Sequence, residues 1–263
     1  MKFKNSLFQK QFDEIGFVKV QLLNDEEIFL LKEYITEKTP IIEKTIQLGF
    51  FQGVCINDKA TKINLDNYIR SIINPKLTNV LENFKEIIYT ALAKGCGENS
   101  KLELHQDSSF VDENIDFSMS LWIPLSDSNF ANGAIHFLNG SHKSFPAIRC
   151  ATISHNYGNI DKIKQNMECI DVKQGEALLF NARMLHYTPN NTSGEIRMAV
   201  MSCLIRSDAD VLQYYKISES RLEAYKMKDD FFLDYENFME DIYQKPKGEK
   251  IGEVDYVPFN TFM

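Results

Sequence analysis

The chain has 263 residues, of which 44% are hydrophobic and 25% are charged, with 37 acidic against 29 basic side chains. These proportions are typical of a globular protein and exclude disordered, collagen-like and disulfide-dense chains. A formal net charge of −8 argues against general affinity for nucleic acid or anionic membranes, because both need a basic surface. No apolar run is long enough to cross a bilayer, and we expect no signal peptide. Five dispersed cysteines without a CxxC pair favour a reducing cytoplasm.

The first 85 residues are expected to be mainly helical. Asn24 is an N-cap residue with Glu27 three positions on, which is a capping box. Pro75 separates two stretches of helical apolar spacing, as a break or a first-turn residue. We therefore expect a strand over 16–20 and helices over 6–14, 24–36, 65–73 and 77–84.

Beyond residue 86, short runs of β-branched and aromatic residues alternate with turn residues. The absence of convincing helices between most of them favours an antiparallel barrel over a parallel α/β sheet. The stretch 141–167 is long for a loop and is expected to cross the barrel mouth. Strands are expected over 87–93, 102–106, 117–123, 134–138, 169–172, 177–180, 184–187 and 198–206.

The predicted fold is mainly β with flanking helices: a double-stranded β-helix, that is, a jelly-roll or cupin-like barrel. We find no internal repeat and no linker, so one domain over 1–263 is expected. It would comprise a helical N-terminal flank over 1–85, a barrel core over about 86–207 and an aromatic C-terminal extension over 208–263.

His105 and Asp107 form an H-x-D triplet at the end of a predicted strand. Side chains two positions apart on a strand point to the same face, so both can converge on one ion. His186, in a later short strand, is the candidate third ligand. Two histidines and one carboxylate leave the opposite metal positions open, which is the geometry of non-haem Fe(II) oxygenases. Alternatively, the histidines are strand residues satisfied by neighbours and Asp107 forms a turn.

Arg197 follows His186 across a predicted hairpin and would return beside it. An arginine that points into an apolar barrel needs a carboxylate or planar dianion as its partner. A dicarboxylate co-substrate could chelate the metal at one end and bind Arg197 at the other. The alternative, a surface ion pair with Glu195, is less attractive because of the position of Arg197 relative to His186.

These residues resemble the phytanoyl-CoA dioxygenase family of Fe(II)- and 2-oxoglutarate-dependent oxygenases. The resemblance extends from about Phe12 to about Asp210, and it depends on the order and spacing of several short motifs. The motifs are Phe12–Val18, Leu104–Asp107, Trp122, Asn132–Gly133, Gly140–Lys143, Lys173–Phe180, Leu185–His186 and Arg197.

The resemblance implies a double-stranded β-helix with an iron site and a 2-oxoglutarate site. Arg197 would bind the far carboxylate of 2-oxoglutarate, and Thr188 matches a hydroxyl position that often joins this contact. Trp122 and Lys94 match positions near the co-substrate, although each could equally be a barrel residue. The implied iron ligands are His105, Asp107 and His186.

The chemistry of these residues agrees with the resemblance. Fe(II) with three protein ligands can accept two oxygens of a 2-oxo acid and still bind O₂, with succinate and CO₂ as products. Related halogenases lack the carboxylate ligand, so Asp107 makes hydroxylation the expected outcome. Desaturation, ring formation or epimerisation would use the same ligands.

The segment after the metal motif would lead along the substrate pocket. Phe110 could form a wall, and Asp112 or Glu113 could pair with a cationic group such as an amine; alternatively, the two acids lie in a solvated loop. The net charge disfavours a CoA thioester, so we expect a small molecule such as an amino acid or a biosynthetic intermediate. The aromatic segment 212–238 could be a lid or an oligomer interface, and the oligomeric state is left open.

Two other functions are compatible with the predicted barrel. A cupin-like metal isomerase or lyase would use the same ligands without O₂, but it has no need for a carboxylate-binding Arg197. A non-enzymatic jelly-roll binding module would not bring His105, Asp107 and His186 together.

Overall fold

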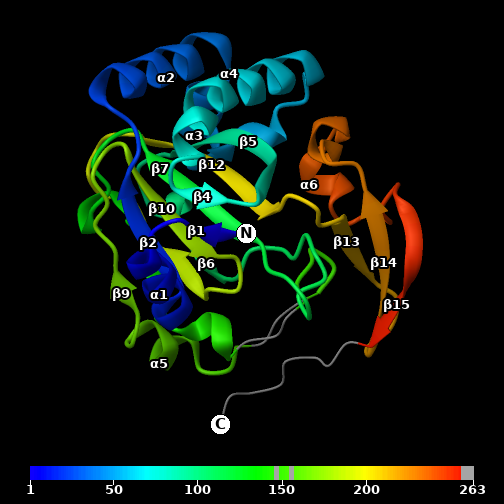
Figure 1. Ribbon diagram of the computed structural model, residues 1–263. Helices are drawn as coiled ribbons and strands as arrows, with labels where there is room; N and C mark the ends of the chain where they lie inside the picture. Colours follow the sequence, from blue (N-terminus) through cyan, green and yellow to red (C-terminus); the bar gives the residue numbers. More distant parts are fainter. Residues whose placement is uncertain (145–147, 154–156, 256–263) are drawn as a thin grey trace.

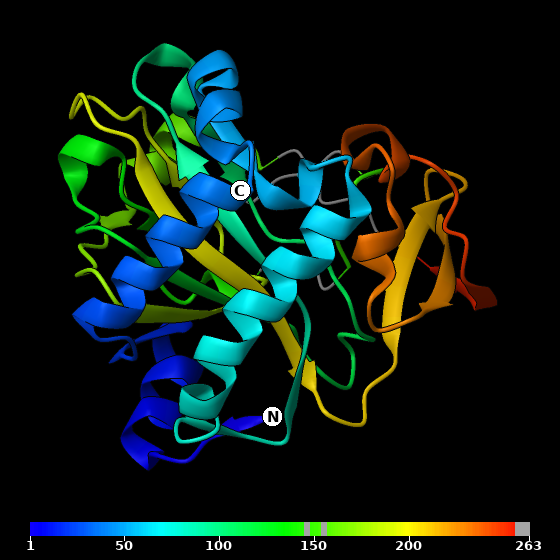
Figure 2. The same cartoon turned by 90° about the horizontal axis from the view of Figure 1, so that it is seen from above.

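Two antiparallel sheets form a barrel, and helices cover the outer face of the larger sheet (Figures 1 and 2). The computed structural model describes residues 1–144, 148–153 and 157–255. The mainly β jelly-roll predicted from the sequence is confirmed. In their order across the larger sheet, the strands are β2 (Phe17–Gln21), β10 (Glu176–Asn181), β7 (Met119–Pro124), β12 (Arg197–Arg206), β5 (Phe84–Lys94) and β3 (Phe50–Gln52). The smaller sheet contains β6 (Leu102–His105), β11 (His186–Thr188), β8 (His136–Phe137) and β9 (Glu168–Cys169).

Side-chain alternation along the larger sheet divides the core into two layers. On the outer face, residues such as Tyr89 and Leu121 belong to the same buried cluster as Ile69 of the covering helices. On the inner face, Trp122 belongs to a second cluster with Phe137 of the smaller sheet. The inner face therefore looks into the barrel, where the candidate site lies.

The N-terminal helices pack on the outer face of the larger sheet (Figure 2). The predicted capping box is present, since Asn24 accepts from the Glu27 N–H and the Glu27 side chain accepts from the Asn24 N–H. No helix in the described residues is long and apolar enough to span a membrane. The helices of this flank are α1 (Ser6–Ile15), α2 (Asp25–Lys38), α3 (Ile41–Leu48) and α4 (Lys59–Leu77).

Pro75 is neither a break nor a first-turn residue as predicted, because it lies in the last turn of the continuous helix α4. The predicted helix over 77–84 is also wrong. Asn83 has a left-handed φ of 57°, which ends any helix and turns the chain into β5. Leu81 instead pairs with Phe3, so that β4 (Leu81–Glu82) forms a small ladder with β1 (Lys2–Phe3).

The N-terminal flank also supplies strands to the barrel. β2 and β3 are the two outermost strands of the larger sheet, although they precede residue 86. The expected strand over 16–20 is β2, whereas α3 and β3 were not expected. The single-domain organisation with its three parts stays a prediction.

The C-terminal extension forms a separate three-stranded sheet beside the barrel (Figure 1). The sequence analysis predicts no strand in this segment. Between its second and third strands lie the 3-10 helix η5 (Phe231–Asp234) and the short helix α6 (Phe238–Asp241). Its strands are β13 (Val211–Lys216), β14 (Arg221–Met227) and β15 (Glu249–Asp255).

The long stretch 141–167 contains η4 (Ser141–Lys143) and the short helix α5 (Ile160–Lys164) in its described parts. Whether it crosses the barrel mouth stays a prediction, since 145–147 and 154–156 lie outside the described residues. All five cysteines are free thiols, of which Cys96 is exposed and Cys203 is buried.

Candidate active site

The two histidines of the predicted metal site lie on neighbouring strands. His105 ends β6 and His186 begins β11, their Cα atoms are register partners, and their ring centroids are 4.2 Å apart. Asp107 follows β6, with Oδ1 3.9 Å from His105 Nε2 and 3.8 Å from His186 Nε2. One ligand atom from each of the three residues lies within 4.8 Å of the others. A binding module in which these side chains stay apart is therefore excluded.

Backbone carbonyls orient both imidazoles. His105 Nδ1 lies 2.7 Å from the Glu103 carbonyl oxygen, and His186 Nδ1 lies 2.9 Å from that of Met184. A carbonyl can only accept, so each neutral ring carries its proton on Nδ1 and presents the Nε2 lone pair to the site. Burial, and then the neighbouring His105, lower the pKa of His186 below its ordinary value, which keeps it neutral as a metal ligand must be. Two such nitrogens and one carboxylate fit Fe(II).

Asp107 is held through its backbone and through one carboxylate oxygen. Its N–H donates to the Ala182 carbonyl over 3.1 Å, and its carbonyl accepts from Arg149 Nε over 2.7 Å. Ser120 Oγ donates to Asp107 Oδ2 over 2.5 Å. These contacts leave Oδ1 directed at the two histidines.

A cavity of about 110 Å³ opens from the triad into the barrel. Arg197 and Lys94 are register partners on β12 and β5, so their side chains lie on the same inner face. The Arg197 guanidinium lies 5.2 Å from the centre of the Trp122 ring. The lining includes every residue predicted for the metal and the co-substrate: His105, Asp107, His186, Arg197, Thr188, Trp122 and Lys94.

Arg197 is only 6% exposed and has no acidic partner in the described part of the chain, Glu195 included. Its Nη1 donates to the Gly133 carbonyl and more weakly to neighbouring oxygens, whereas its Nε is buried without an acceptor among the described residues. Burial lowers its pKa to about 10, so the guanidinium stays charged at neutral pH. The barrel therefore holds a cation with free hydrogen-bonding capacity.

Lys94 is a second buried cation in the same cavity. It is 1% exposed, and its Nζ donates to the Ser100 carbonyl and, over 2.9 Å, to Thr188 Oγ1. Burial, and then the charge of Arg197, lower the pKa of Lys94 to about 7. Two buried cations without a carboxylate are costly in isolation and form a strong site for an anion.

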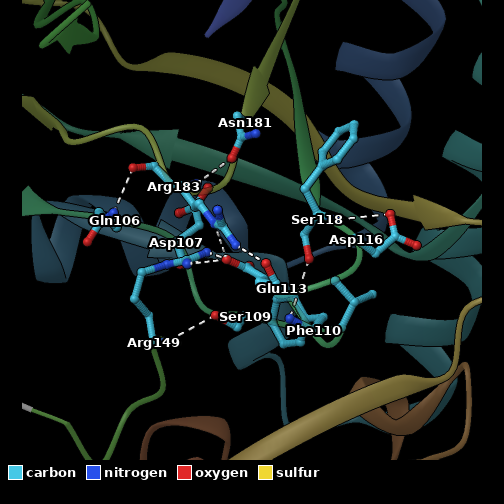
Figure 3. Close-up of polar contacts among 12 residues, drawn as sticks. Gln106, Asp107, Ser109, Phe110, Glu113, Asp116, Ser118, Arg149, Asn181 and Arg183 are labelled. Atoms are coloured by element: carbon cyan, nitrogen blue, oxygen red, sulfur yellow. Dashed lines mark hydrogen bonds and ion pairs between the residues drawn. The ribbon is translucent and has the colours of Figure 1, made fainter. Parts of the chain in front are cut away.

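Glu113 does not face this cavity, and neither a substrate amine nor solvent is its partner (Figure 3). Its fully buried carboxylate accepts from Arg149 over 2.5 and 2.8 Å and from Arg183 Nε over 2.6 Å. The sequence-based expectation of a substrate-binding or solvated Glu113 is therefore wrong. Its carboxylate instead forms ion pairs with two arginines from distant parts of the chain, and these pairs tie the segment after Asp107 to both of them.

The two other predicted substrate residues lie in different surroundings. Asp112 Oδ1 accepts from the Asn114 N–H over 3.1 Å and from its amide over 2.9 Å, which is a local turn. Asp112 does not line the cavity at the triad or the two cavities next to it. Phe110 lines a second cavity that begins at Asp107, so a role at the substrate stays a prediction for Phe110 alone.

The sequence-based prediction missed three polar residues that contact Asp107 or line the cavity. Ser120 lies two positions before Trp122 on β7, so the two side chains share a face. The inward position of Ser120 could therefore have been found from strand periodicity. Gln52 lies on the unexpected strand β3 and lines the cavity. Arg149 comes from a loop in which no local pattern indicates a partner.

Known proteins resemble this chain in sequence. The family model described as phytanoyl-CoA dioxygenase matches residues 53–199, which is more than half of the chain. A phytanoyl-CoA dioxygenase domain-containing protein 1 homolog of Dictyostelium discoideum is 26% identical over 154 residues, covering 55% of this chain and 52% of the relative. The chain thus matches about half the length of that relative.

Solved structures share the fold at low sequence identity. The non-heme alpha-ketoglutarate-dependent carbocyclase SnoK from nogalamycin biosynthesis superposes with a TM-score of 0.58 at 15% identity, covering 79% of this chain and 86% of SnoK. HygX from Streptomyces hygroscopicus, solved with nickel and 2-oxoglutarate bound, has a TM-score of 0.53 at 16% identity, covering 78% and 88%. With the family match extending over the strands that carry the triad, the chain belongs to the phytanoyl-CoA dioxygenase family.

Proposed function

We propose that the protein is an Fe(II)- and 2-oxoglutarate-dependent oxygenase that hydroxylates a small molecule, with release of succinate and CO₂. One observation carries this proposal: a triad of metal-binding character and two buried cations without acidic partners line a single cavity. HygX binds 2-oxoglutarate together with nickel, and we take the nickel to stand where Fe(II) would bind, which supports a metal and 2-oxoglutarate as the cofactor pair here. Bound Fe(II) would supply O₂ activation coupled to decarboxylation of the 2-oxo acid.

Each residue has a distinct part in this proposal. His105 Nε2, His186 Nε2 and Asp107 Oδ1 would hold the metal, and the carbonyls behind the rings keep the imidazoles in place. In the adjoining cavity, Arg197 would bind the distal carboxylate of 2-oxoglutarate, assisted by the Thr188 hydroxyl and the Lys94 ammonium. Apolar neighbours such as Trp122 would exclude water from the reaction.

Hydroxylation is the proposed outcome because Asp107 supplies a carboxylate ligand where related halogenases have none. The runner-up, a cupin-like metal isomerase or lyase, gives no reason for two buried cations beside the metal site. The expectations of a cytoplasmic location and of no nucleic-acid partner stay predictions from composition.

Anaerobic spectroscopy tests the proposal. Adding Fe(II) and then 2-oxoglutarate should produce the visible charge-transfer band of the chelate, and air should then yield succinate. Asp107→Ala should abolish turnover, whereas Glu195→Gln, a change at an exposed neighbour of Arg197, should leave band and turnover intact. Absence of both band and succinate in the wild type would refute the function, and a fully active Asp107→Ala variant would refute the triad.

A further inference from the structure

A second cavity, of about 150 Å³, begins at Asp107 and extends away from the co-substrate cavity. We call it the inner chamber. Gln52, Asp107 and Met201 line both cavities and form the boundary between them. If the proposed function holds, on which this inference rests, a molecule in the inner chamber lies directly beside the metal.

The C-terminal extension supplies part of the chamber wall. Phe232 of η5 and Phe238 of α6 line it together with Phe110. The ring centroids of Phe110 and Phe232 are 5.3 Å apart, and those of Phe232 and Phe238 are 6.1 Å apart. Both extension residues lie beyond residues 53–199, the part matched by the family model, so this wall is a feature of the chain outside the family match.

The extension is tied to the segment that follows the metal motif. The Leu212 N–H donates to the Phe110 carbonyl over 2.9 Å, and the Tyr214 hydroxyl donates to the Val111 carbonyl over 3.1 Å. On its other side, Asp234 pairs with Lys59 of α4 over 2.6 Å. These contacts hold the extension, and with it the aromatic wall, against the segment that follows Asp107 and against α4.

The chamber continues outward between the barrel and the extension. A further cavity of about 90 Å³ shares four lining residues with it, and Asp107 is the only charged side chain among the described residues that line the two. Glu113, which could have supplied a negative charge nearby, is neutralised by Arg149 and Arg183. Because the metal would take up the charge of Asp107, a charged group would enter this space without a counter-ion from the lining residues, which is costly. The four shared residues are Ser108, Phe110, Phe232 and Phe238.

Gln52 offers a polar group to a substrate at the chamber boundary. It is the register partner of Leu92, so its side chain lies on the inner face, and its amide has no hydrogen-bond partner among the described residues. The hydroxyl residues Thr90, Ser108, Ser120 and Ser202 also line the chamber, and the rest of the wall is mainly apolar. An apolar cavity of about 150 Å³ is large enough for a six-membered ring.

We propose that the inner chamber binds the part of the substrate that is oxidised, that this part is uncharged, mainly apolar and about the size of one ring, and that Phe232 and Phe238 determine which molecules fit. This replaces the expectation of an amino acid or amine held by acidic residues. Gln52 would donate or accept one hydrogen bond to a hydroxyl or carbonyl group of such a molecule.

Three probes of nearly equal size test the substrate class: benzyl alcohol, benzylammonium and benzoate. The protein is loaded with Zn(II), a redox-inert ion that accepts the same ligands, and with 2-oxoglutarate; calorimetry first verifies that both bind. Ligand-detected NMR titrations then give the affinity of each probe. We expect benzyl alcohol to bind about tenfold or more tightly than either charged probe.

Variants of the extension test the wall. Phe232→Ala and Phe238→Ala should weaken benzyl alcohol binding about tenfold by removing apolar contact. Phe238→Trp, which adds volume, should also reduce binding without creating a cavity. Tyr243→Ala is the matched control, since this aromatic residue of the extension is 55% exposed and lines neither cavity. Zn(II) and 2-oxoglutarate affinities should stay unchanged in all four variants.

The possible failures are distinct. If Zn(II) and 2-oxoglutarate do not bind the wild type, the proposed function is wrong. If both bind but the charged probes bind as tightly as benzyl alcohol, the assignment of an uncharged substrate is wrong. If the probe binds and both Phe238 variants behave like Tyr243→Ala, the extension does not form the substrate wall.

Discussion

Arg149 and Arg197 are both almost completely buried, 2% and 6% exposed, but only Arg149 has a carboxylate partner in the described structure. Arg149 lies against Glu113 and donates from Nε to the Asp107 carbonyl. Arg197 has carbonyl and hydroxyl acceptors on one side only, and its Nε is without an acceptor among the described residues. The two guanidiniums lie on different sides of the same candidate metal site. The charge of Arg149 is compensated by a carboxylate, whereas the charge of Arg197 is not.

The difference separates a structural cation from a ligand-binding one. A buried ion pair fixes the segments that it joins, and its charges are used internally. A buried cation without an acidic partner lowers the free energy of unfolding as long as no anion is bound to it. Such a cation therefore favours a carboxylate ligand over water. Arg149 thus positions the backbone of Asp107, and Arg197 is available to a co-substrate.

Removal of the shared carboxylate should have the largest effect on stability. Glu113→Gln removes the carboxylate that faces the buried Arg149 and the partly buried Arg183, and we expect a loss of about 3–5 kcal/mol in the free energy of unfolding. Arg197→Met should instead leave stability unchanged or raise it, because it removes an uncompensated charge. Urea denaturation of both variants, with Glu195→Gln as the exposed control, measures the difference. Equal destabilisation by the two would mean that Arg197 also has an internal partner.

The same two arginines should exchange roles when binding is measured. Arg197→Met should weaken 2-oxoglutarate binding about 30-fold or more at saturating metal, since a buried charge-assisted contact is lost. Arg149→Lys keeps a cation beside Glu113 but loses the Nε donor to Asp107, so it should lower metal affinity about 10-fold while co-substrate affinity stays similar. Calorimetric titrations with Zn(II) and then 2-oxoglutarate separate the two constants.

Arg183→Lys is the matched control for Arg149→Lys. Arg183 also contacts Glu113, but its side chain has no hydrogen bond to Asp107. If the two lysine variants lose metal affinity equally, the effect reflects general loosening of the ion cluster and not positioning of the Asp107 backbone.

The site was predictable where strand periodicity or register carried the information. The H-x-D spacing places His105 and Asp107 near one ion. The expected hairpin between His186 and Arg197 is wrong, because β11 and β12 belong to different sheets; the two residues line the same cavity from those sheets, and Arg197 is the register partner of Lys94. Arg149 was not predictable in this way. Its contacts depend on how a long loop packs on the segment after Asp107, and neither segment has a repeating pattern.

The fold follows the same rule. The barrel strands were found because both of their faces are buried, which gives short runs of β-branched and aromatic residues between turn residues. The expected helix over 77–84 is wrong because the spacing of the apolar residues there fits a helix and also fits a chain that turns at Asn83. The strands of the extension were missed because Val211–Lys216 and Arg221–Met227 carry polar and aromatic residues on both faces, which obscures the alternation.

Lys94 gives the smallest expected effect on co-substrate binding, and that effect depends on pH. Its pKa in the folded protein, about 7, lies below the ordinary value of 10.5. Between these values the unfolded chain binds a proton that the folded protein does not, so the free energy of unfolding rises with pH, by at most about 1.4 kcal/mol per unit. Binding of 2-oxoglutarate should change in the opposite direction, because the neutral amine does not attract a carboxylate.

Lys94→Met should remove the pH dependence of the free energy of unfolding and that of 2-oxoglutarate binding. The variant therefore distinguishes Lys94 from the other groups of the cavity. In the wild type, 2-oxoglutarate affinity should fall a few-fold as pH rises above the pKa of Lys94, about 7, with the midpoint shifted upward because the bound carboxylate holds the proton on the amine. In Lys94→Met the affinity should be lower at pH 6.5 and nearly flat above it, while Arg197 keeps its charge throughout. Calorimetric titrations at several pH values measure this. An unchanged slope in Lys94→Met would assign the dependence to another group and leave Arg197 as the sole cation for the co-substrate.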